Sequence, residues 1–579
     1  MRMLLVVSAV NSLTQRAYAE LRDRGHTLAV HILSGSGSGS GSSGSSGSAS
    51  DALRDAVRRQ RPDLIIAPML TTAIPRDVWS AHTCLIVHPG PPGDRGPSSL
   101  DWAIHEDATA WGVTVLQAND VMDGGDIWAT APCPLPRTGK SDLYRNEITD
   151  AAITALTTAV DRFSSGRHTP RPQHGPTWRT ADHTRPRRTQ DHRRIDWNHD
   201  TSEHILRQLR AADSRPGVLD DLLGQGWFLH GGHPEDELRG TPGQLLATRA
   251  GALCRATVDG AVWIERLRPR RRPGGPPTYP LPATLALGDA LPALPDSPPP
   301  LEPRPGRRTF TDIVYREDGP VGQLRFSFPG GAMSTGQCLR LRAAYRHALT
   351  RPTSVLVLGP RRDVFSHGIH LNVIEAAPDP AQESWANLNA LNDLVADVLT
   401  TTDRLVVAAV PGNAAAGGVM LAAAADEVWC RHGAVLNPHY RLMGLYGSEY
   451  WTYTLPRRVG AATARHLTRR ALPMTATAAR DIGLADQVID ASPGAFAARV
   501  GHLAHTLARG PGLDERIARK KAAHEHSESV KPLHAYRAEE LAVMRRIFFD
   551  PQAPYHRLRS AFVHKEPAVP PGPALLPPP

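Results

Sequence analysis

The first 165 residues alternate short apolar runs with segments of helical periodicity. Short, continuously apolar runs are typical of strands that are buried on both faces, and such strands need helical connections between them. The pattern predicts an α/β fold with helices on the faces of an open sheet. The expected strands are Met3–Val7, Leu64–Met69, Leu85–His88 and Val113–Gln117.

A chain of 579 residues is several times the usual domain length of about 150 residues, so we expect a multidomain α/β protein. Changes in composition suggest where the parts begin and end. We expect an α/β domain over 1–165, a small β-rich domain over 190–267, a Pro- and Arg-rich linker over 268–308, a third domain over 309–500, a charged helical extension over 501–563 and a disordered tail over 564–579.

One stretch interrupts the first domain. Ser34–Ser50 contains little besides glycine and serine, has no side chains that could form a core, and is typical of a flexible coil. Such a composition is found in native loops and in engineered ones alike. Further on, Ser141 is a candidate cap for a helix that carries Ile153, Leu156 and Val160 at helical spacing and would close the domain.

The charge balance limits the classes of partner. Lys and Arg number 66 and Asp and Glu 57, which gives a formal net charge of +9 and suits anionic small molecules. Nucleic acid is not expected, because the alternation of arginine and aromatic residues that is typical of nucleic-acid surfaces is missing. No apolar run is long enough to span a bilayer, so no membrane partner is expected.

The cysteines and the N-terminus indicate the compartment. The five cysteines lie far apart, without the spacing of metal ligands or of a disulfide framework, so we expect a reduced, cytoplasmic chain with no metal site. The first apolar run is followed by a segment with Leu13, Ala17 and Leu21 on one helical face. This favours a buried strand feeding a helix over a signal peptide.

A histidine follows the third apolar run and is the first candidate functional residue. His88 is followed by PGPPG, which prevents the strand from continuing, and Ser98 and Ser99 are candidate caps of the next helix. Alone, His88 is equally compatible with a surface turn. Asp123, in the glycine turn after WGVTVLQ, could meet it and form a proton-transfer pair around a bound electrophile. The first strand lacks a glycine-rich phosphate loop, which argues against a dinucleotide or nucleoside triphosphate.

The sequences around His88, GDRGPSSLDWAI and WGVTVLQ…MDGGDI resemble the formyltetrahydrofolate-dependent formyltransferases. The resemblance implies that an Asn-x-His motif and the Asp of a DxG turn hold the formyl group and manage a proton. His88 and Asp123 match two of these positions, but Ile86 stands at the asparagine. Because an apolar side chain cannot donate to an oxyanion, backbone or another side chain must take that role. The small domain is similar to the C-terminal domain of methionyl-tRNA formyltransferase, which makes transfer RNA a conceivable partner.

Two small-residue loops form a second candidate site. VFSHGIHL and PGNAAAGGVM can aim backbone N–H groups at one carbonyl oxygen. With GQLRFSFPGGAMSTGQCLRLRAAYRHAL they resemble the crotonase, or enoyl-CoA hydratase/isomerase, superfamily over residues 309–495. The resemblance implies an oxyanion hole at Ile369 and Gly417 that polarises an acyl-CoA thioester. Met420 and His439 stand where the hydratases carry glutamates, so hydration is not expected.

The segment LNPHYRLMGLYGSEYW supplies candidates for acid–base chemistry at this second site. His439, Tyr440 and Glu449 are the candidates, whereas Tyr446, Tyr450 and Tyr453 are equally compatible with core aromatics. The predicted cofactor-binding residues of the two sites are Met69, Leu70, Ile74, Asp120, Met122, Ser366 and Gly368.

The joining of these two domains, with IVHPG…GDRGPSSLDWAI and NPHY…GLYGSEYWTY, resembles the HypX/HoxX family of hydrogenase maturation factors. The family implies synthesis of carbon monoxide for nickel–iron hydrogenase from the formyl group of formyltetrahydrofolate. Our hypothesis is a bifunctional enzyme in which the first site transfers the formyl group to coenzyme A and the second decarbonylates formyl-CoA. Coenzyme A would serve both sites with a swinging arm or through an internal passage. The alternatives are an amine formyltransferase with a regulatory CoA-binding domain, and a scaffold that delivers one-carbon units to hydrogenase assembly proteins.

Overall fold

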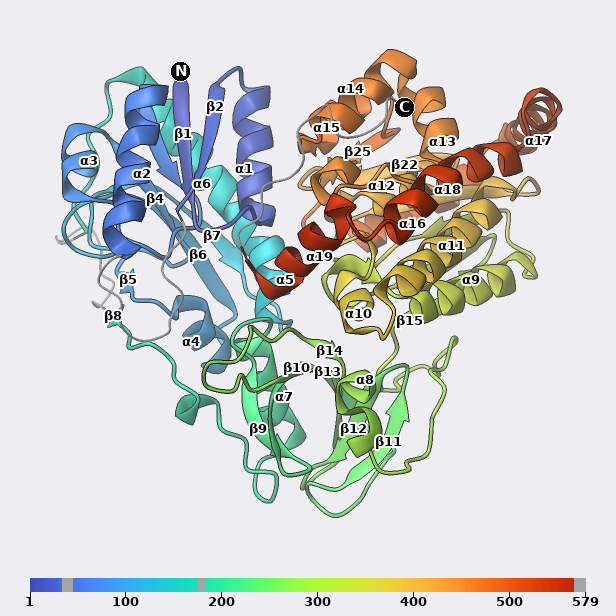
Figure 1. Cartoon of the computed structure of the whole chain (residues 1–579), viewed down its shortest axis with the longest axis horizontal. Coiled ribbons are helices and arrows are strands. Elements are labelled where there is room, and N and C mark those ends of the chain that lie inside the picture. Colours follow the sequence, from blue (N-terminus) through green and yellow to red (C-terminus); the bar gives the residue numbers. More distant parts are fainter. Residues whose placement is uncertain (34–44, 174–182, 567–579) are drawn as a thin grey trace. The chain divides into compact units, whose positions relative to one another are not determined.

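The chain forms two compact units, residues 1–194 with 207–216 and residues 195–206 with 217 onward. Within residues 1–33, 45–173 and 183–566, which the computed structural model describes, the first unit contains a six-stranded sheet in the order β2-β1-β3-β4-β6-β7 (Figure 1). The strands from β2 to β4 run parallel, whereas β6 is antiparallel to both β4 and β7. The strands are β1 (Arg2–Val7), β2 (Thr27–Ile32), β3 (Leu64–Ala67), β4 (Cys84–His88), β6 (Ala110–Gln117) and β7 (Ile127–Pro134).

Helices cover both faces of this sheet because its central strands are apolar on both sides. Leu5 and Val87 belong to the core under α1, α4, α5 and α6, and Leu4 and Ile65 to the core under α2 and α3. The alternation of buried strands and helices predicted from the sequence is therefore present. The helices are α1 (Ser12–Asp23), α2 (Ser45–Gln60), α3 (Arg76–Ala81), α4 (Ser99–His105), α5 (Lys140–Arg145) and α6 (Glu147–Ser165).

The glycine- and serine-rich stretch is only partly described. Residues 34–44 lie outside the described residues, and the coil predicted for Ser34–Ser50 is wrong for its last part, because α2 begins at Ser45. The same helix packs Leu53, Ala56 and Val57 against the sheet. Tertiary packing of an apolar face can extend a helix into residues of low intrinsic propensity.

The three serines predicted as helix caps have other roles. Ser98 occupies the N-cap of α4 without capping it, and its hydroxyl instead accepts from the N–H of Arg188 (3.1 Å). The hydroxyl of Ser99 donates to the carbonyl of Pro89 (3.0 Å) and so ties α4 to the loop after β4. Ser141 lies inside α5 and bonds Asp213, while the long helix α6 begins only at Glu147.

A small antiparallel sheet has the order β11-β12-β13-β10-β9, with β14 paired to β13. Its core combines Ala247, Cys254, Trp263 and Phe310. The helix α7 precedes Pro216 and Gly217. The elements are α7 (Ser202–Ala212), β9 (Val218–Leu222), β10 (Gln225–Glu235), β11 (Leu245–Arg249), β12 (Ala252–Ala256), β13 (Ala261–Pro269), β14 (Leu281–Pro282) and α8 (Ala283–Leu287).

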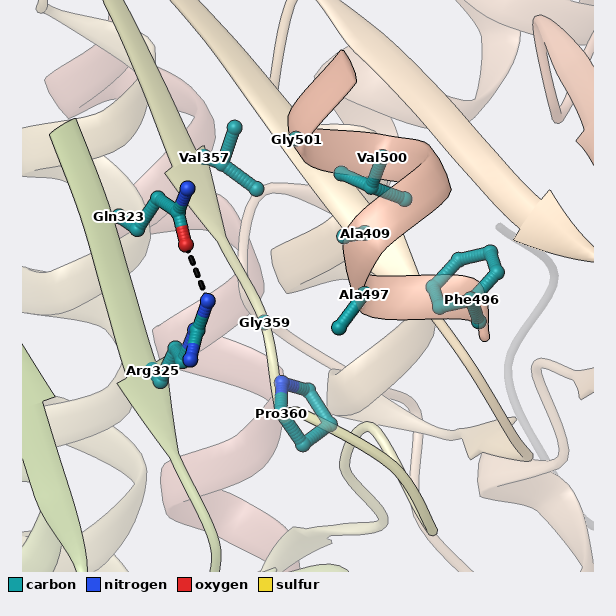
Figure 2. A pocket seen from close by; sticks show the side chains of 10 residues that line it. All are labelled: Gln323, Arg325, Val357, Gly359, Pro360, Ala409, Phe496, Ala497, Val500 and Gly501. Atoms are coloured by element: carbon teal, nitrogen blue, oxygen red, sulfur yellow. Dashed lines mark hydrogen bonds between the residues drawn. The ribbon is translucent and has the colours of Figure 1, made fainter. Parts of the chain in front are cut away.

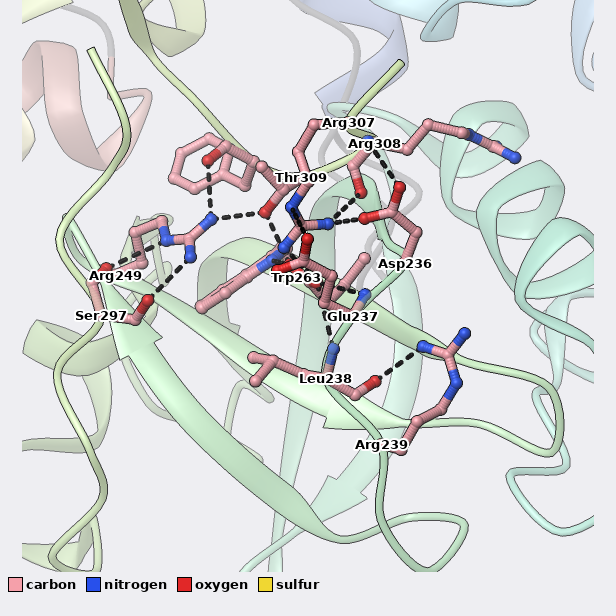
Figure 3. A network of polar contacts seen from close by, with 12 residues as sticks. Asp236, Glu237, Leu238, Arg239, Arg249, Trp263, Ser297, Arg307, Arg308 and Thr309 are labelled. Carbon is pink, nitrogen blue, oxygen red and sulfur yellow. Dashed lines mark hydrogen bonds and ion pairs between the residues drawn. The ribbon is translucent and has the colours of Figure 1, made fainter. Parts of the chain in front are cut away.

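The segment predicted as a linker, 268–308, is bound to this small sheet. β14 and α8 lie within it, and the carbonyl and hydroxyl oxygens of Ser297 accept from the guanidinium of Arg249 at 3.0 and 2.8 Å (Figure 3). At its end Arg307 pairs with Glu235, and Thr309 donates to the same carboxylate at 2.6 Å. Proline-rich backbone can make few hydrogen bonds of its own, so side chains anchor it.

The carboxylate of Glu235 is the centre of that anchor. Burial alone would raise its pKa, but hydrogen bonds from Thr309, Trp263 and the Glu237 amide outweigh burial and hold the pKa at about 2. This fully bonded anion is a structural link between the small sheet and the start of the next domain.

The third domain is built on a sheet in the order β15-β16-β18-β20-β22-β25, parallel apart from the β15–β16 hairpin. Two smaller sheets, β17-β19 and β21-β23-β24, carry the loops of the second candidate site. The strands are β15 (Ile313–Asp318), β16 (Val321–Phe326), β17 (Ala332–Met333), β18 (Val355–Leu358), β19 (Gly368–Ile369), β20 (Leu405–Val410), β21 (Ala414–Ala415), β22 (Glu427–Arg431), β23 (Val435–Asn437), β24 (Met474–Thr475) and β25 (Gln487–Ile489).

Helices pack on both faces of this sheet. α9 and α11 share the larger core with Leu324, Leu356 and Val406, and α16 covers the opposite face. Helix α9 begins with a capping box formed by Ser334 and Gln337. The helices are α9 (Thr335–Leu349), α10 (Leu371–Ala376), α11 (Pro380–Leu399), α12 (Gly417–Ala423), η4 (Tyr440–Met443), α13 (Trp451–Val459), α14 (Ala461–Arg470), α15 (Ala476–Asp481), α16 (Phe496–Ala508), α17 (Leu513–Val530), α18 (Leu533–Phe549) and α19 (Pro554–His564).

A small cleft lies between the sheet and α16. Figure 2 shows Arg325 and Gln323 on the strand side and Phe496 and Val500 on the helix side. Its volume of about 20 Å³ leaves room for little more than a water molecule. This cleft is therefore no site for an organic ligand.

The helical extension is integrated into the third domain. Leu533, Met544, Phe548 and Tyr555, from α18 and α19, join its main core. Residues 567–579 of the predicted disordered tail lie outside the described residues. Within the described part of the chain, none of the helices combines the length and the apolar character that crossing a membrane requires.

Two candidate active sites

A pocket of about 380 Å³ lies beside the end of β4, a volume suited to a small organic ligand. His88 and Asp123 both line it. So do the five predicted cofactor-binding residues of this domain, Met69, Leu70, Ile74, Asp120 and Met122. The structure thus brings all seven of these predicted residues to one pocket.

Asp123 reaches His88 through an unusual loop. Because β6 is antiparallel to β4, the loop after Gln117 starts opposite Leu85, at the far end of β4, and folds back toward the histidine. Asp123 has a positive φ of 53°, and any side chain at Gly125 would overlap the Gln117 carbonyl. The glycine turn is therefore what returns the carboxylate to the site.

The imidazole of His88 lies between two carboxylates. Its Nδ1 is 3.4 Å from Oδ1 of Asp123, and its Nε2 donates to Oδ2 of Asp94 at 3.1 Å. Asp94 lies on the short strand β5 (Asp94–Arg95), which pairs with β8 (His183–Thr184). A Cβ on Gly90 would overlap both His88 and Asp94, so only glycine allows this close turn. Sequence reasoning missed Asp94, although it stands in the GDRG motif.

The two carboxylates decide the charge of the histidine. Burial alone would lower the pKa of His88, but hydrogen bonds and charge from Asp123 and Asp94 raise it to about 9. Burial would raise the pKa of Asp123, yet the hydrogen bond with His88 lowers it overall. At neutral pH the site holds an imidazolium cation and an ionised Asp123. Ile86 lines the same pocket and, as expected, offers no hydrogen bond.

The second site is formed where the two small-residue loops meet. A Cβ on Gly368 would lie only 3.2 Å from the amide nitrogen of Gly417, and Gly368 has a φ of +79°. Gly417 is the first residue of α12, so its N–H has no acceptor within the helix. Ser366, predicted to bind cofactor, is fully buried; its hydroxyl accepts from the Gly368 N–H (3.1 Å). Ile369 follows Gly368 on β19. The two residues predicted to form the oxyanion hole, Ile369 and Gly417, therefore lie on adjacent loops.

Glu449 faces the start of α12. A Cβ on Gly417 would lie 2.7 Å from Oε1 of Glu449. Its other oxygen, Oε2, accepts from the hydroxyl of Tyr440 (2.7 Å) and from the N–H of Ser448 (3.2 Å). Oε1 is thus the oxygen that points to the loop junction, while Oε2 is held by neutral donors.

Burial sets the protonation of this pair. It raises the pKa of Glu449 to about 7, against the lowering effect of the bonds from Tyr440 and Ser448. Burial and the adjacent Glu449 raise the pKa of Tyr440. A carboxyl group with a pKa near neutrality can both accept and release a proton at working pH, which is the property of a general acid–base.

The other candidates of this segment have different surroundings. His439 directs Nδ1 to the carbonyl of Asn437 (3.0 Å), and burial lowers its pKa. Tyr450 is buried in the main core, whereas Tyr446 and Tyr453 pack against its edge. Met420 is fully buried in α12. The three tyrosines thus contribute to the core, the alternative that the sequence left open.

Two residues that hold Glu449 were not predicted. Oδ1 of Asn392, on α11, accepts from the backbone N–H of Glu449 (2.8 Å), and Nδ2 of Asn392 donates to the hydroxyl of Ser448. The carboxylate of Glu540, on α18, accepts from the N–H of Tyr450 (3.0 Å). Neither lies in a motif near Glu449, so no local signal could have identified them.

Three family models match the chain. The model described as Formyl transferase matches residues 1–160, Formyl transferase, C-terminal domain, matches 187–274, and Enoyl-CoA hydratase/isomerase matches 340–560. The multidomain α/β class predicted from the sequence is confirmed. Each candidate site thus lies in a region with a recognised enzyme fold.

Relatives extend over both units. The hydrogenase maturation factor HoxX of Bradyrhizobium diazoefficiens is 45% identical over 573 residues, covering 98% of this chain and 95% of HoxX. HypX from Aquifex aeolicus, crystallised with tetrahydrofolic acid, is 38% identical with a TM-score of 0.92 and covers 99% of this chain and 98% of HypX. Methionyl-tRNA formyltransferase of Pseudoalteromonas translucida is 25% identical over 226 residues, 38% of this chain and 68% of that enzyme.

Proposed function

Because the chain belongs to the family of hydrogenase maturation factors that includes HoxX and HypX, we propose that it makes carbon monoxide for the active site of nickel–iron hydrogenase. The formyl group of formyltetrahydrofolate is transferred to the thiol of coenzyme A at the His88 site. Formyl-CoA is then decarbonylated at the Glu449 site. The observation that carries the proposal is the presence, in one chain, of a clamped imidazolium and a buried carboxyl group beside two adjacent glycine loops.

The pocket at His88 fits the formyl donor in size and chemistry. Its walls include the apolar side chains of Met69, Leu70 and Ile74, which suit a flat heteroaromatic ring, and polar groups gather at Asp120 and Asp123. The HypX relative was crystallised with tetrahydrofolic acid, which supports a folate in this pocket. In the second site, the Ile369 and Gly417 N–H groups suit the carbonyl oxygen of a thioester.

In the first step, the thiol sulfur attacks the formyl carbon. The positive charge of His88 stabilises the oxyanion. It thereby takes the role of the asparagine amide, because Ile86 stands at the asparagine position. Asp123 accepts the proton of the thiol. The new C–S bond forms, the bond from the formyl carbon to the folate nitrogen breaks, and that nitrogen receives the proton. A thiol loses its proton more readily than an amine does after attack. Formyl transfer to the thiol of coenzyme A therefore needs no additional amide donor.

In the second step, the N–H groups of Ile369 and Gly417 hold the formyl oxygen. Oε1 of Glu449 takes the proton from the formyl carbon as the C–S bond breaks, and the sulfur takes the electron pair of that bond. The same proton then passes to the thiolate. The products are carbon monoxide and coenzyme A, with no net oxidation or reduction.

The test is incubation of the whole protein with formyltetrahydrofolate and coenzyme A, with carbon monoxide trapped by reduced haem. We expect haem–CO to form with the wild-type protein and to fall to background with His88→Ala. Equal signals from the two proteins overturn the proposal. Formylated amine without a requirement for coenzyme A would instead select the amine formyltransferase with a regulatory second domain.

A further inference from the structure

Two consecutive residues at the second site have a conformation that side chains disfavour. Glu449 and Tyr450 both have a φ of +60°. Left-handed backbone costs free energy for residues other than glycine, and it persists only where surrounding contacts enforce it. The conformation aims Glu449 at Gly417, so the contacts that enforce it also set the geometry of the site.

Glu540 supplies three of these contacts from a distant part of the chain. It lies on α18 and is 0% exposed. Its Oε2 accepts from the N–H of Tyr450 (3.0 Å), and its Oε1 accepts from the N–H (2.8 Å) and the hydroxyl (2.6 Å) of Thr452. Tyr450 is the N-cap residue of α13 and makes no capping bond with its own side chain. Glu540 thus caps α13 with a side chain that comes from another helix, α18.

A cap of ordinary purpose would not require a buried carboxylate. Burial of a carboxyl group costs free energy, and a hydroxyl or an amide satisfies the first N–H groups of a helix at lower cost. Here the acid bonds the backbone of the residue that follows Glu449, a second acid that is also buried. The charge of Glu449 raises the affinity of Glu540 for a proton.

We propose that Glu540 is a positioning residue for decarbonylation, which holds the Glu449–Tyr450 backbone so that Oε1 of Glu449 faces the formyl group. The inference rests on the proposed function. It extends the site to α18, outside the segments in which the motifs lie, and makes the helical extension part of the machinery for CO release.

The electrostatic surroundings agree with this arrangement. Burial and the charge of Glu449 raise the pKa of Glu540 to about 8, against the bonds from Thr452. The titratable groups that interact with the two acids are Tyr440 on η4, Cys338 on α9, and Tyr446 and Tyr450 before α13. Arg537 on α18 acts on Tyr450, bonds Asn389 and pairs with Asp393. The cation beside Tyr450 is thus matched by Asp393.

The decisive variant is Glu540→Gln, with Glu539→Gln as its matched control. Glu539 is the neighbouring residue, is exposed and pairs with Lys531, so its change is the same substitution on the same helix without loss of the three bonds. A glutamine at 540 keeps the size of the side chain but has only one acceptor oxygen for three donors.

The measurement is CO release from supplied formyl-CoA as a function of pH. For Glu540→Gln we expect kcat to fall about tenfold or more across the pH range, while the KM for formyl-CoA stays within about twofold, because the reacting groups are misaligned and binding is not lost. Formyl transfer at the His88 site stays at the wild-type rate. A kcat equal to that of Glu539→Gln overturns the inference.

Amide hydrogen exchange separates this inference from the proposed function. The N–H groups of Tyr450 and Thr452 should exchange faster in Glu540→Gln than in Glu539→Gln, whatever the reaction is. If the wild-type protein releases no CO while this difference is present, the proposed function fails and the positioning contact stands. Unchanged exchange overturns the contact. Should Glu540→Gln not fold, Thr452→Ala removes one of the three bonds, and a wild-type kcat there counts against the inference.

Discussion

The two candidate sites use burial to opposite effect. His88 and Glu449 are both almost inaccessible, with exposures of 4% and 2%. The imidazole lies between two carboxylates and remains charged up to a pKa of about 9. The carboxyl group of Glu449 is bonded by neutral donors, and burial raises its pKa to about 7. The charge of the partners therefore decides which form of a buried group is stable, and burial alone does not.

This difference suits the two proposed reactions. Transfer of a formyl group develops negative charge on oxygen, which a fixed cation stabilises. Removal of the formyl proton needs a group that takes and returns a proton, which a carboxyl group with a pKa near neutrality does. The first site holds a charge and the second holds a proton. Substitutions at the first site should therefore affect formyl transfer, and substitutions at the second should affect CO release.

The largest expected effect comes from removing the proton acceptor of the second site. Glu449→Gln keeps the shape of the side chain but cannot take a proton at Oε1, so CO release should fall by about 10²–10⁴-fold. Formyl transfer should continue, and formyl-CoA should accumulate. Chromatography of the acyl-CoA products together with haem trapping measures both. Undiminished CO release would remove Glu449 from the mechanism.

The second prediction concerns the pH dependence of stability, where the two sites share a sign but differ in range. The folded pKa of His88 is raised above its ordinary value of 6.5, so its stabilisation is complete below that pH and is lost as the pH rises to about 9. For Glu449 the contribution to stability is lost between its ordinary pKa of 4.5 and its raised pKa of about 7. Each shift corresponds to about 3 kcal/mol.

Hydrogen exchange can measure the two ranges separately, because peptides from β1–β7 and from β15–β25 report on different units. His88→Gln should abolish the decline in unfolding free energy in the upper pH range in the first unit only. Glu449→Gln should reduce the decline in the lower range in the second unit only, where Glu540 still contributes to it. If both variants lose the same pH range, the contrast between the sites is wrong.

The third prediction tests the clamp on His88. Asp94→Asn removes one of the two charges that stabilise the imidazolium, so the pKa of His88 should fall and formyl transfer above neutral pH should drop about tenfold. Nuclear magnetic resonance titration of the His88 ring measures the pKa directly. Asp126→Asn, at an exposed position near Asp123, is the control. A pKa of His88 that is equal in the two variants contradicts the clamp.

Local pattern predicted much of the fold, and contacts of long range were beyond it. Apolar runs identified the central strands, and glycine turns identified the loops of both sites, because periodicity and turn chemistry are local properties. Asp94 was missed because its approach to His88 depends on the tight turn at Gly90. Asn392 and Glu540 reach the second site only through the packing of α11 and α18. No spacing in the sequence encodes that packing.

The smallest expected effect is at His439, which sequence reasoning placed beside Glu449 as a candidate acid–base. Its Nδ1 donates to the carbonyl of Asn437, and burial lowers its pKa, so the ring is neutral and committed to its own strand. In His439→Asn the amide nitrogen can replace Nδ1 as the donor. CO release should therefore stay within about threefold of wild type, against the much larger loss expected for Glu449→Gln. A loss of CO release approaching that of Glu449→Gln, with formyl-CoA accumulating, would show that His439 also transfers protons at the second site. The second site would then hold two proton carriers, and its contrast with the fixed charge of the first site would have to include both.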